Sequence, residues 1–343
     1  MNMLYVVAIR QNQSGGSESL HQLAAEVKKN GMSVAMYYSD CNSLEVPDKF
    51  KKYDLTVANE IKDSDGNVIV VAETETQILF DYKKIRKCIW WLSRDFYYGY
   101  ANLEGLIRSA QRHGIKRTLY PIYVPIVFIK KKLTPKYFRF QKKDSGIFHL
   151  YNCEYARLYL KENGIEKDQT LYMCGPIRNE YFDTPFIDKE NIVAYNPKKN
   201  FEYTIKVIAL LQQKRPDIQV VAIEGMKPQE IVNLLNRCKV YIDFGQFPGP
   251  ERIPREAVTC RCNILTSRYG STRNSIDVPI PDQFKIDASS KNITKIVNMI
   301  SELTDKYEHY VSKYDIYRKK VANQRVLLAE NTKIFIDHFL DSI

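Results

Sequence analysis

A loop rich in glycine and proline, followed by charged residues, is the part of the sequence whose residue types best fit ligand chemistry. Residues 243–257 read Asp-Phe-Gly-Gln-Phe-Pro-Gly-Pro-Glu-Arg-Ile-Pro-Arg-Glu-Ala. Pro254 suits the first position of a helix, which would place Arg255 and Glu256 in its first turn. An arginine can bind phosphate bidentately, and a carboxylate can accept both hydroxyls of a ribose. The loop therefore predicts a nucleotide site, with a helix-dipole role as the alternative for Glu256.

Two further loops have residues suited to phosphate. Ser14-Gly15-Gly16-Ser17 precedes an expected helix, whose free N–H groups favour an anion that glycine lets approach closely. Asn196-Pro197-Lys198-Lys199-Asn200 follows an expected strand, and two lysines there can neutralise a diphosphate. The alternatives are a plain tight turn and a solvated turn. The fingerprint G-x-G-x-x-G is absent, which argues against a dehydrogenase.

The elements that must position these loops alternate between apolar runs and amphipathic stretches. Strands are predicted at 3–9, 33–38, 67–72, 89–92 and 147–151, and then at 192–195, 218–223, 240–244 and 263–266. Helices are predicted between them and from 293 to the end. This pattern predicts an α/β protein with two Rossmann-like domains facing each other across a cleft. We place the N-terminal domain at 1–165, a linker at 166–187, the C-terminal domain at 188–325, and a helix at 326–343 that packs back on the N-terminal domain.

Composition narrows the class of protein. The chain has 343 residues, of which 44% are hydrophobic, enough for two buried cores. We expect no signal peptide and no membrane-spanning helix, because Met1 leads directly into a strand and the longest apolar stretch is short. Seven cysteines without C-x-x-C spacing indicate reduced, mostly buried thiols. The protein is therefore expected to be cytoplasmic.

The net charge of +11 has a local origin. No acidic residue occurs between Glu104 and Asp144, whereas eleven basic residues do: Arg108, Arg112, Lys116, Arg117, Lys130, Lys131, Lys132, Lys136, Arg139, Lys142 and Lys143. Aromatic residues are interleaved with them: Tyr120, Tyr123, Phe128, Tyr137, Phe138 and Phe140. Such a mixture suits either nucleic acid or the interface of an anionic bilayer, where the Tyr and Phe rings would sit at the headgroup level. The plain alternative is a solvated face.

Several segments together resemble a group of bacterial GT-B glycosyltransferases from surface-polysaccharide (capsule or O-antigen) clusters. They span most of residues 1–290 and comprise 247–257, Asn263-Ile264-Leu265-Thr266 with Gly270-Ser271, Ile89-Trp90-Trp91-Leu92-Ser93 with Asp95, His149-Leu150-Tyr151 with Glu154-Tyr155-Ala156, and Tyr195-Asn196-Pro197-Lys198-Lys199. The resemblance implies a donor nucleotide held mainly by the C-terminal domain. Glu256 would match the ribose-binding second glutamate of an E-x7-E motif.

The same resemblance implies further roles. Lys198 or Lys199 would match the diphosphate-binding lysine, and Gly15 and Gly16 the glycine pair of the N-terminal domain. Pro248 stands where the motif has its first glutamate, so Pro248 and Gly249 would line the donor site differently, with Glu251 as a substitute for the sugar contact. For this reason, a retaining outcome does not carry over.

An inverting transferase needs a general base that takes the proton of the acceptor. Asp95 is the first candidate and Glu73 the second, since both follow predicted strands. His149 is read as a core residue, and the Trp90-Trp91 pair as core packing, with stacking on a sugar as the alternative for the pair. Asp63-Ser64-Asp65 precedes Gly66-Asn67 and looks like a turn. No metal is expected, since Lys and Arg side chains can hold the leaving diphosphate instead. No cofactor is expected either, the nucleotide-sugar being a substrate.

The sequence thus predicts a hexosyltransferase that moves a sugar from a UDP- or GDP-linked donor to a saccharide or polyprenyl-pyrophosphate-linked acceptor in surface polysaccharide synthesis. Two alternatives remain open: a nucleotide- or sugar-binding protein without turnover, and a nucleotide-sugar 2-epimerase. A nucleic-acid partner is not expected, because no recognised nucleic-acid module is present. Association with the inner face of the cell membrane is expected from the basic stretch.

Overall fold

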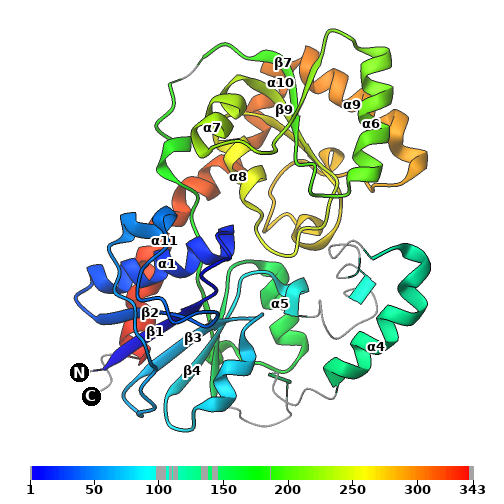
Figure 1. Cartoon of the computed structure of the whole chain (residues 1–343). Helices are drawn as coiled ribbons and strands as arrows, with labels where there is room; N and C mark the ends of the chain where they lie inside the picture. Colours follow the sequence, from blue (N-terminus) through cyan, green and yellow to red (C-terminus); the bar gives the residue numbers. More distant parts are fainter. Residues whose placement is uncertain are drawn as a thin grey trace. The chain divides into compact units, whose positions relative to one another are not determined.

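Two parallel β-sheets organise the part of the chain that the computed structural model describes, which is residues 2–97, 106–107, 110, 115–132, 138–140, 146–185 and 187–339 (Figure 1). They belong to two compact units, one formed by 1–175 with 325–343 and the other by 176–324. The first boundary falls inside the range 166–187 that the sequence analysis assigned to a linker.

The first unit contains a six-stranded sheet in the order β2-β1-β3-β4-β5-β6. Its strands are β1 (Met3–Ala8), β2 (Ser33–Tyr38), β3 (Val68–Ala72), β4 (Arg86–Trp91), β5 (Ile147–Tyr151) and β6 (Thr170–Tyr172). All pairings are parallel, and Met3 of β1 faces Ser33 of β2. The sequence analysis did not predict β6, which is only three residues long. Its helical segments are α1 (Gly15–Lys29), η1 (Asp48–Tyr53), η2 (Thr76–Asp81), α2 (Arg94–Tyr97), η4 (Arg117–Leu119), α4 (Tyr120–Lys132), α5 (Glu154–Glu162) and η5 (Lys167–Gln169).

The apolar runs of this sheet supply two core layers, one on each face. Leu4 and Val6 of β1 belong to one layer, and Tyr5 and Val7 belong to the other. This division follows from the two-residue period of a strand and explains why the runs are apolar throughout. Leu23 of α1 packs into the first layer together with the second half of α11 (Asp315–Phe339), whereas α5 packs into the other.

The second unit contains a four-stranded parallel sheet in the order β10-β9-β7-β8. Its strands are β7 (Glu190–Tyr195), β8 (Gln219–Ala222), β9 (Cys238–Asp243) and β10 (Asn263–Thr266). Its helical segments are η6 (Asn179–Tyr181), α6 (Phe201–Lys214), α7 (Pro228–Arg237), α8 (Arg252–Thr259), η7 (Gly270–Arg273), η8 (Asp282–Phe284), η9 (Ser290–Asn292), α9 (Ile293–Asp305), α10 (Tyr307–Val311) and η10 (Ser312–Tyr314), and α11 begins here. The strand order reverses between β7 and β9, and ligands of open α/β sheets bind at such a switch point.

The structure corrects two details of the sequence analysis. Helix α8 begins at Arg252, so Pro254 is its third residue and Glu256 lies beyond the first turn. Phe138 and Phe140 do not lie on a surface for lipid or nucleic acid. Phe138 is 3% exposed, and Phe140 stacks on Trp91 with ring centroids 5.6 Å apart. Phe138 is part of the first unit's core, and Phe140, which is partly buried, packs against it, as burial of an apolar ring is favourable.

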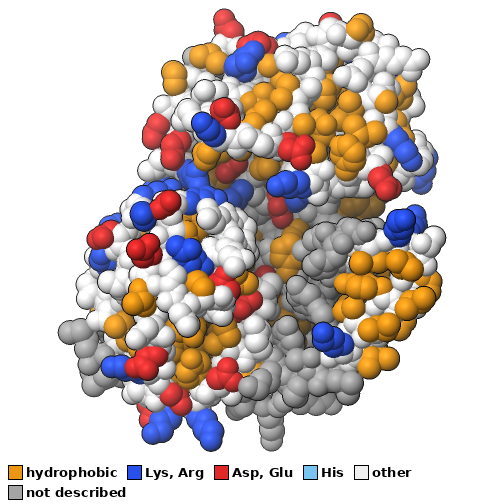
Figure 2. Space-filling model, in the orientation of Figure 1, with side chains coloured by type: hydrophobic (Ala, Val, Ile, Leu, Met, Phe, Trp, Pro, Cys, Tyr) orange, Lys and Arg blue, Asp and Glu red, His pale blue; other side chains and the backbone are white. Residues whose placement is uncertain are grey.

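Three expectations from composition can be compared with the described residues: those on membrane helices, on the cysteines and on the basic stretch. No helix in the described residues is long and apolar enough to span a membrane. Six of the seven cysteines are buried, as predicted. Figure 2 shows hydrophobic side chains gathered on the surface over α4. Arg108, Arg112, Lys136, Tyr137, Lys142 and Lys143 of the basic stretch, and the side chains of Lys131 and Lys132, lie outside the described residues.

Candidate functional site

The loop after β9 is held in place by the segment after β10. The Ser267 Oγ donates to the carbonyl oxygen of Gly245 at 2.7 Å, and the Ser271 backbone N–H donates to that of Phe247 at 2.9 Å. Gly270 has φ +64°, and a Cβ there would lie 2.0 Å from the Phe247 carbonyl oxygen. Only glycine fits this conformation and this close approach. These contacts hold the loop in one position at the carboxyl edge of the second sheet, and residues 244–251 are called the platform below.

Lys199 extends from the loop after β7 onto this platform. Its Nζ lies 2.6 Å from Glu251 Oε2 and 3.9 Å from Asp243 Oδ2, and it donates to the Gln246 carbonyl oxygen at 3.0 Å. Burial disfavours the charged form of Lys199. The negative charges of Glu251 and Asp243 have the larger effect, so the pKa of Lys199 is raised above its usual value. Lysine and platform interlock, since a Cβ on Gly245 would lie 2.5 Å from the Lys199 Cβ.

The two lysines of this loop differ in their surroundings. Lys198 is exposed, whereas the Lys199 side chain is 18% exposed and its ammonium lies 4.7 Å from the centre of the Phe247 ring. The switch point of the sheet therefore places one fixed cation beside the loop after β9. Lys198 and Lys199 were both predicted to bind a diphosphate, and Lys199 is the one whose ammonium is held in place, by Glu251 and the Gln246 carbonyl oxygen.

Glu256 is buried on α8 and is surrounded by positive charge. It shares a hydrogen bond with the Tyr181 hydroxyl, and burial raises its pKa against the opposing charges of Arg252, Arg255 and Arg178. The sequence analysis assigned no role to Tyr181, Arg178 or Arg252. Arg178 and Tyr181 belong to the segment before β7, and nothing local in the sequence indicates that this segment reaches α8.

Arg255 is directed into the protein. It is 3% exposed and donates from Nη1 to Gln324 Oε1 at 2.7 Å, from Nη2 to the Pro250 carbonyl oxygen at 2.9 Å, and from Nε to the Glu251 carbonyl oxygen at 3.1 Å. These contacts hold the end of the loop against α8. Pro248 and Gly249 are buried in the same loop, where the Gly249 carbonyl oxygen accepts from the Ser271 Oγ at 2.9 Å.

The carboxyl edge of the first sheet holds the other predicted residues. Its strand order reverses between β1 and β3, so Gly15 and Gly16 after β1 lie at the same switch point as Glu73 after β3. Helix α1 begins at Gly15 with Ser14 as its N-cap. A Cβ on Gly16 would make only ordinary contact, 3.6 Å from Leu92 Cδ1, so packing does not require glycine there.

Glu73 and Asp95 differ in burial. Glu73 is 3% exposed, and its two carboxylate oxygens accept the backbone N–H of Leu92 at 2.8 Å and of Ser93 at 3.1 Å. Burial raises the pKa of Glu73 to about 7 in spite of these hydrogen bonds. Asp95, on α2, is only partly buried, and its Oδ1 accepts from the Tyr155 hydroxyl at 2.9 Å. Asp95 is thus the more accessible carboxylate.

The residues read as core are in the core. Trp90 and Trp91 are fully buried; the Trp90 Nε1–H donates to the Met173 carbonyl oxygen at 3.1 Å, and the Trp91 Nε1–H donates to His149 Nδ1 at 3.0 Å. Burial lowers the pKa of His149 to about 3, so the imidazole is neutral. Within the part of the chain that the structure describes, no group of three or more His, Cys, Asp or Glu side chains is placed to hold a metal ion.

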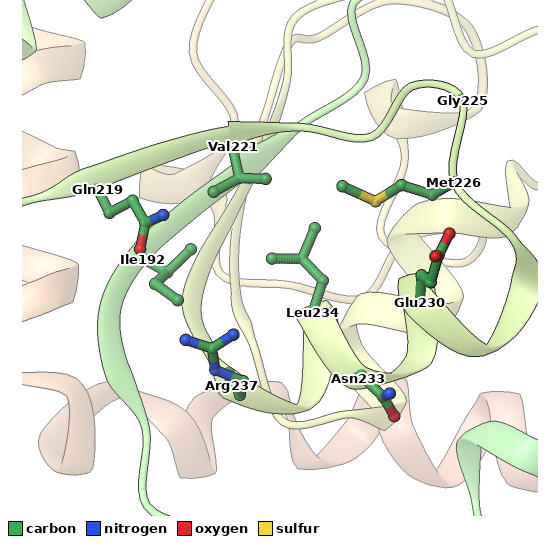
Figure 3. Close-up of a pocket in the computed structure, with 9 residues that line it drawn as sticks. All are labelled: Ile192, Gln219, Val221, Gly225, Met226, Glu230, Asn233, Leu234 and Arg237. Carbon is green, nitrogen blue, oxygen red and sulfur yellow. The ribbon is translucent and has the colours of Figure 1, made fainter.

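A separate hollow of about 440 Å³ lies along the edge strand β8 and helix α7 (Figure 3). It is lined by Ile192, Gln219, Val221, Gly225, Met226, Glu230, Asn233, Leu234 and Arg237. None of the predicted site residues lines it. Arg237, at one end, is engaged by Glu190, with Nε 2.6 Å from Oε1. The hollow is therefore distinct from the loops at the carboxyl edge.

Comparison with solved structures identifies the fold. The chain is similar to a glycosyltransferase from Rickettsia africae, with 13% identity, a TM-score of 0.57, and coverage of 100% of this chain and 99% of that one. It is similar to the pneumococcal O-GlcNAc transferase GtfA in complex with UDP and GlcNAc, with 9% identity, a TM-score of 0.61 and coverage of 100% and 99%. It is also similar to WaaG, a glycosyltransferase involved in lipopolysaccharide biosynthesis, with 10% identity, a TM-score of 0.57 and coverage of 99% and 100%.

These likenesses show that the chain has the GT-B fold: two units, each with a parallel sheet, and a helical C-terminal segment. No protein-family model matches the sequence. No curated protein matches it significantly. The fold predicted from the sequence is confirmed.

Proposed function

We propose that the protein is a glycosyltransferase that takes a sugar from a UDP- or GDP-linked donor bound at the carboxyl edge of its second sheet. The observation that carries this proposal is the placement of Lys199 and the platform 244–251 at the switch point between β7 and β9. An open α/β sheet binds nucleotides at such a point. The GT-B fold supports the choice of reaction, since the similar structures include a transferase solved with UDP and GlcNAc.

In this proposal Lys199 and Glu256 divide the recognition of the nucleotide. Glu256 accepts the hydroxyls of the ribose. Burial raises the pKa of Glu256, and the charges of the three neighbouring arginines oppose that rise. The Lys199 ammonium turns from Glu251 to the diphosphate, whose charge is greater than that of one carboxylate. Arg255 positions the loop through its contacts with Pro250 and Glu251 and does not itself contact phosphate.

Transfer breaks the bond between the anomeric carbon of the sugar and the diphosphate oxygen, and joins that carbon to an acceptor oxygen. The acceptor hydroxyl must lose its proton in this step. Asp95 is the proposed base because its carboxylate is partly accessible, whereas both oxygens of Glu73 accept backbone N–H groups. Glu73 instead ties the end of β3 to the residues after β4. The negative charge that develops on the leaving diphosphate is stabilised by Lys199.

The acceptor is proposed to be a saccharide or a lipid-linked saccharide in the synthesis of a surface polysaccharide, in the cytoplasm at the inner face of the cell membrane. The likeness to WaaG, described as involved in lipopolysaccharide biosynthesis, supports this class of acceptor. We propose that the reaction needs no metal, because the Lys199 ammonium supplies positive charge for the diphosphate.

One observation favours a second candidate, a nucleotide-sugar-binding protein without turnover. Pro248 is buried where the resembled motif has a glutamate that contacts the sugar, so that contact is missing from its usual place. Glu251 follows Pro248 by three residues and is the next carboxylate along the loop, and its Oε2 is paired with the Lys199 ammonium. If Lys199 moves to the diphosphate, Glu251 is released toward the sugar, and this exchange favours the transferase.

A thermal-shift screen against nucleoside diphosphates and their sugars tests the proposal. A ligand that binds only the folded state raises the unfolding midpoint, increasingly so with concentration. We expect one uridine or guanosine diphosphate, and its sugar conjugate, to raise the midpoint, and adenosine diphosphate to have less effect. Slow release of the nucleoside diphosphate from the sugar conjugate would separate the transferase from the binding protein. The absence of any shift across the panel would contradict the proposed function.

A further inference from the structure

The exposed side of α4 is apolar from Pro121 to Ile129. Ile122, Ile126 and Ile129 follow one another at intervals of four and three residues, which places them on one face of the helix. Their exposed fractions are 63%, 59% and 56%, and Leu119, just before the helix, is 49% exposed. Pro121 and Pro125 are also exposed. This aliphatic face forms the hydrophobic surface over α4 in Figure 2.

The opposite side of α4 is occupied by packing, so the aliphatic face is not a core face turned outward. Val124 is 6% exposed, and Tyr123, Val127 and Phe128 are partly buried. The helix therefore has apolar residues on both sides, and only one of these two sides is buried. Contiguous exposed apolar patches mark sites of interaction with proteins or membranes.

The charges around the face indicate which partner fits. Lys116 and Arg117 precede α4 and are exposed, and Lys130 follows the last isoleucine and is exposed too. No acidic residue occurs anywhere in 105–143, while eleven basic residues do. An apolar stripe bordered by charges of a single sign matches the interface of an anionic bilayer, which offers hydrocarbon beneath a negative surface. Nucleic acid offers phosphates but no apolar layer for three isoleucines.

We propose that α4 docks the protein on an anionic lipid bilayer, lying in the plane of the interface with Leu119, Ile122, Ile126 and Ile129 among the acyl chains. Lys116, Arg117 and Lys130 then reach the headgroups, since long basic side chains extend along an apolar surface to the polar layer. In this proposal the aliphatic face takes the role at the bilayer that the sequence analysis gave to the Tyr and Phe rings of the basic stretch. This docking goes beyond glycosyl transfer and does not depend on it.

Co-sedimentation of the full-length protein with vesicles tests the docking. The vesicles are phosphatidylcholine with an increasing fraction of phosphatidylglycerol, at low and at high salt. We expect binding that rises with the anionic fraction and weakens with salt, because the attraction of the basic residues is screened. The double variant Ile122→Glu/Ile126→Glu should bind at least about tenfold more weakly at low salt, because two carboxylates would enter the apolar layer.

The matched control is Ile316→Glu/Ile334→Glu, which changes two isoleucines of α11 that are 70% and 51% exposed. It adds the same charge and should bind vesicles like the unaltered protein. Circular dichroism checks that both variants are folded. Failure of the unaltered protein to bind anionic vesicles at low salt, or equal binding by the two variants, would overturn the proposal. So would a dimer in gel filtration that only the α4 variant abolishes, because a second copy would then cover the face. The response to nucleotides is measured separately, so either idea can fail without the other.

Discussion

Lys198 and Lys199 are neighbours in the sequence, but their ammonium groups are in different surroundings. Lys198 is exposed, whereas Lys199 is fixed by Glu251 and by the Gln246 carbonyl oxygen. A buried, paired ammonium is already largely desolvated and oriented, so moving it to a diphosphate costs less ordering than immobilising an exposed side chain. The pair therefore offers a test at the residue scale, with Lys198 as the control for Lys199.

We expect Lys199→Ala to weaken the binding of the nucleoside diphosphate by on the order of tenfold or more, since a charge-assisted contact contributes roughly 1.5–3 kcal/mol. The binding of the nucleoside alone should change little, and Lys198→Ala should change neither. Calorimetric titration of both ligands gives the comparison. If Lys199→Ala weakens the two ligands equally, its effect is on the structure of the loop and not on the phosphates.

Glu73 gives a prediction on pH. Its pKa is about 7 in the folded protein, above the usual value of 4.5, because burial disfavours the carboxylate. The folded state therefore holds the proton more tightly than the unfolded state, and the stability that this provides is complete below about pH 4.5 and is lost as the pH rises through about 7. Over that window the loss amounts to at most about 3 kcal/mol.

The comparison that isolates this effect is with Glu73→Gln, which cannot titrate. Between about pH 5 and about pH 8 the free energy of unfolding of the unaltered protein should fall relative to that of the variant. Tryptophan fluorescence in urea reports on the correct unit, because the only two tryptophans of the chain, Trp90 and Trp91, lie in the first unit's core. Parallel pH profiles for the two proteins would contradict the shifted pKa.

At the scale of elements, α11 shows how a distant segment completes a core. The helix begins in the second unit, and its residues from 325 onward belong to the first. Leu328, Phe335, Ile336 and Phe339 pack in the same layer as Leu4 and Trp90. The first sheet therefore depends on the end of the chain for part of the apolar cover on one face.

Neighbouring residues of α11 test this dependence. Phe335 is fully buried, whereas Ile334 is 51% exposed. Phe335→Ala should destabilise the first unit by about 3–5 kcal/mol, the usual cost of removing a buried aromatic ring, and Ile334→Ala should change its stability by less than about 0.5 kcal/mol. Urea titration followed by tryptophan fluorescence measures both. Equal effects of the two substitutions would show that this end of α11 does not stabilise the first unit.

The elements were predictable wherever one physical signal dominates. Continuous apolar runs predicted β1 and β7 to within a residue or two, because strands covered on both faces have no polar side. The start of α8 was misplaced, since proline fits any position of the first turn and the actual first residue is Arg252. Tyr181 and Arg178 beside Glu256 could not be predicted, because their contact arises from tertiary packing.

At the scale of the whole molecule, the GT-B fold is shared with solved glycosyltransferases at 9–13% identity. Such low identity leaves the fold intact because apolar residues of similar size can replace one another in a core. Such low identity gives no residue-by-residue guide to the loops that follow the strands. Pro248, at the position where the resembled motif has a glutamate, is one example of a loop residue whose role the fold does not indicate. The proposed function therefore has to be tested at the polar residues that lie at the carboxyl edges of the two sheets.

Calorimetric titration of uridine and guanosine diphosphates into the unaltered protein and into Glu256→Ala tests the central claim most directly. We expect one of the two nucleotides to bind the unaltered protein. Glu256→Ala should bind it more weakly by about 1–3 kcal/mol, because the ribose hydroxyls lose their acceptor. Glu202→Ala, which removes an exposed carboxylate of α6, should bind it as before. Unchanged affinity in a folded Glu256→Ala variant, or no binding of either nucleotide to the unaltered protein, would contradict a nucleotide-sugar site in the second unit.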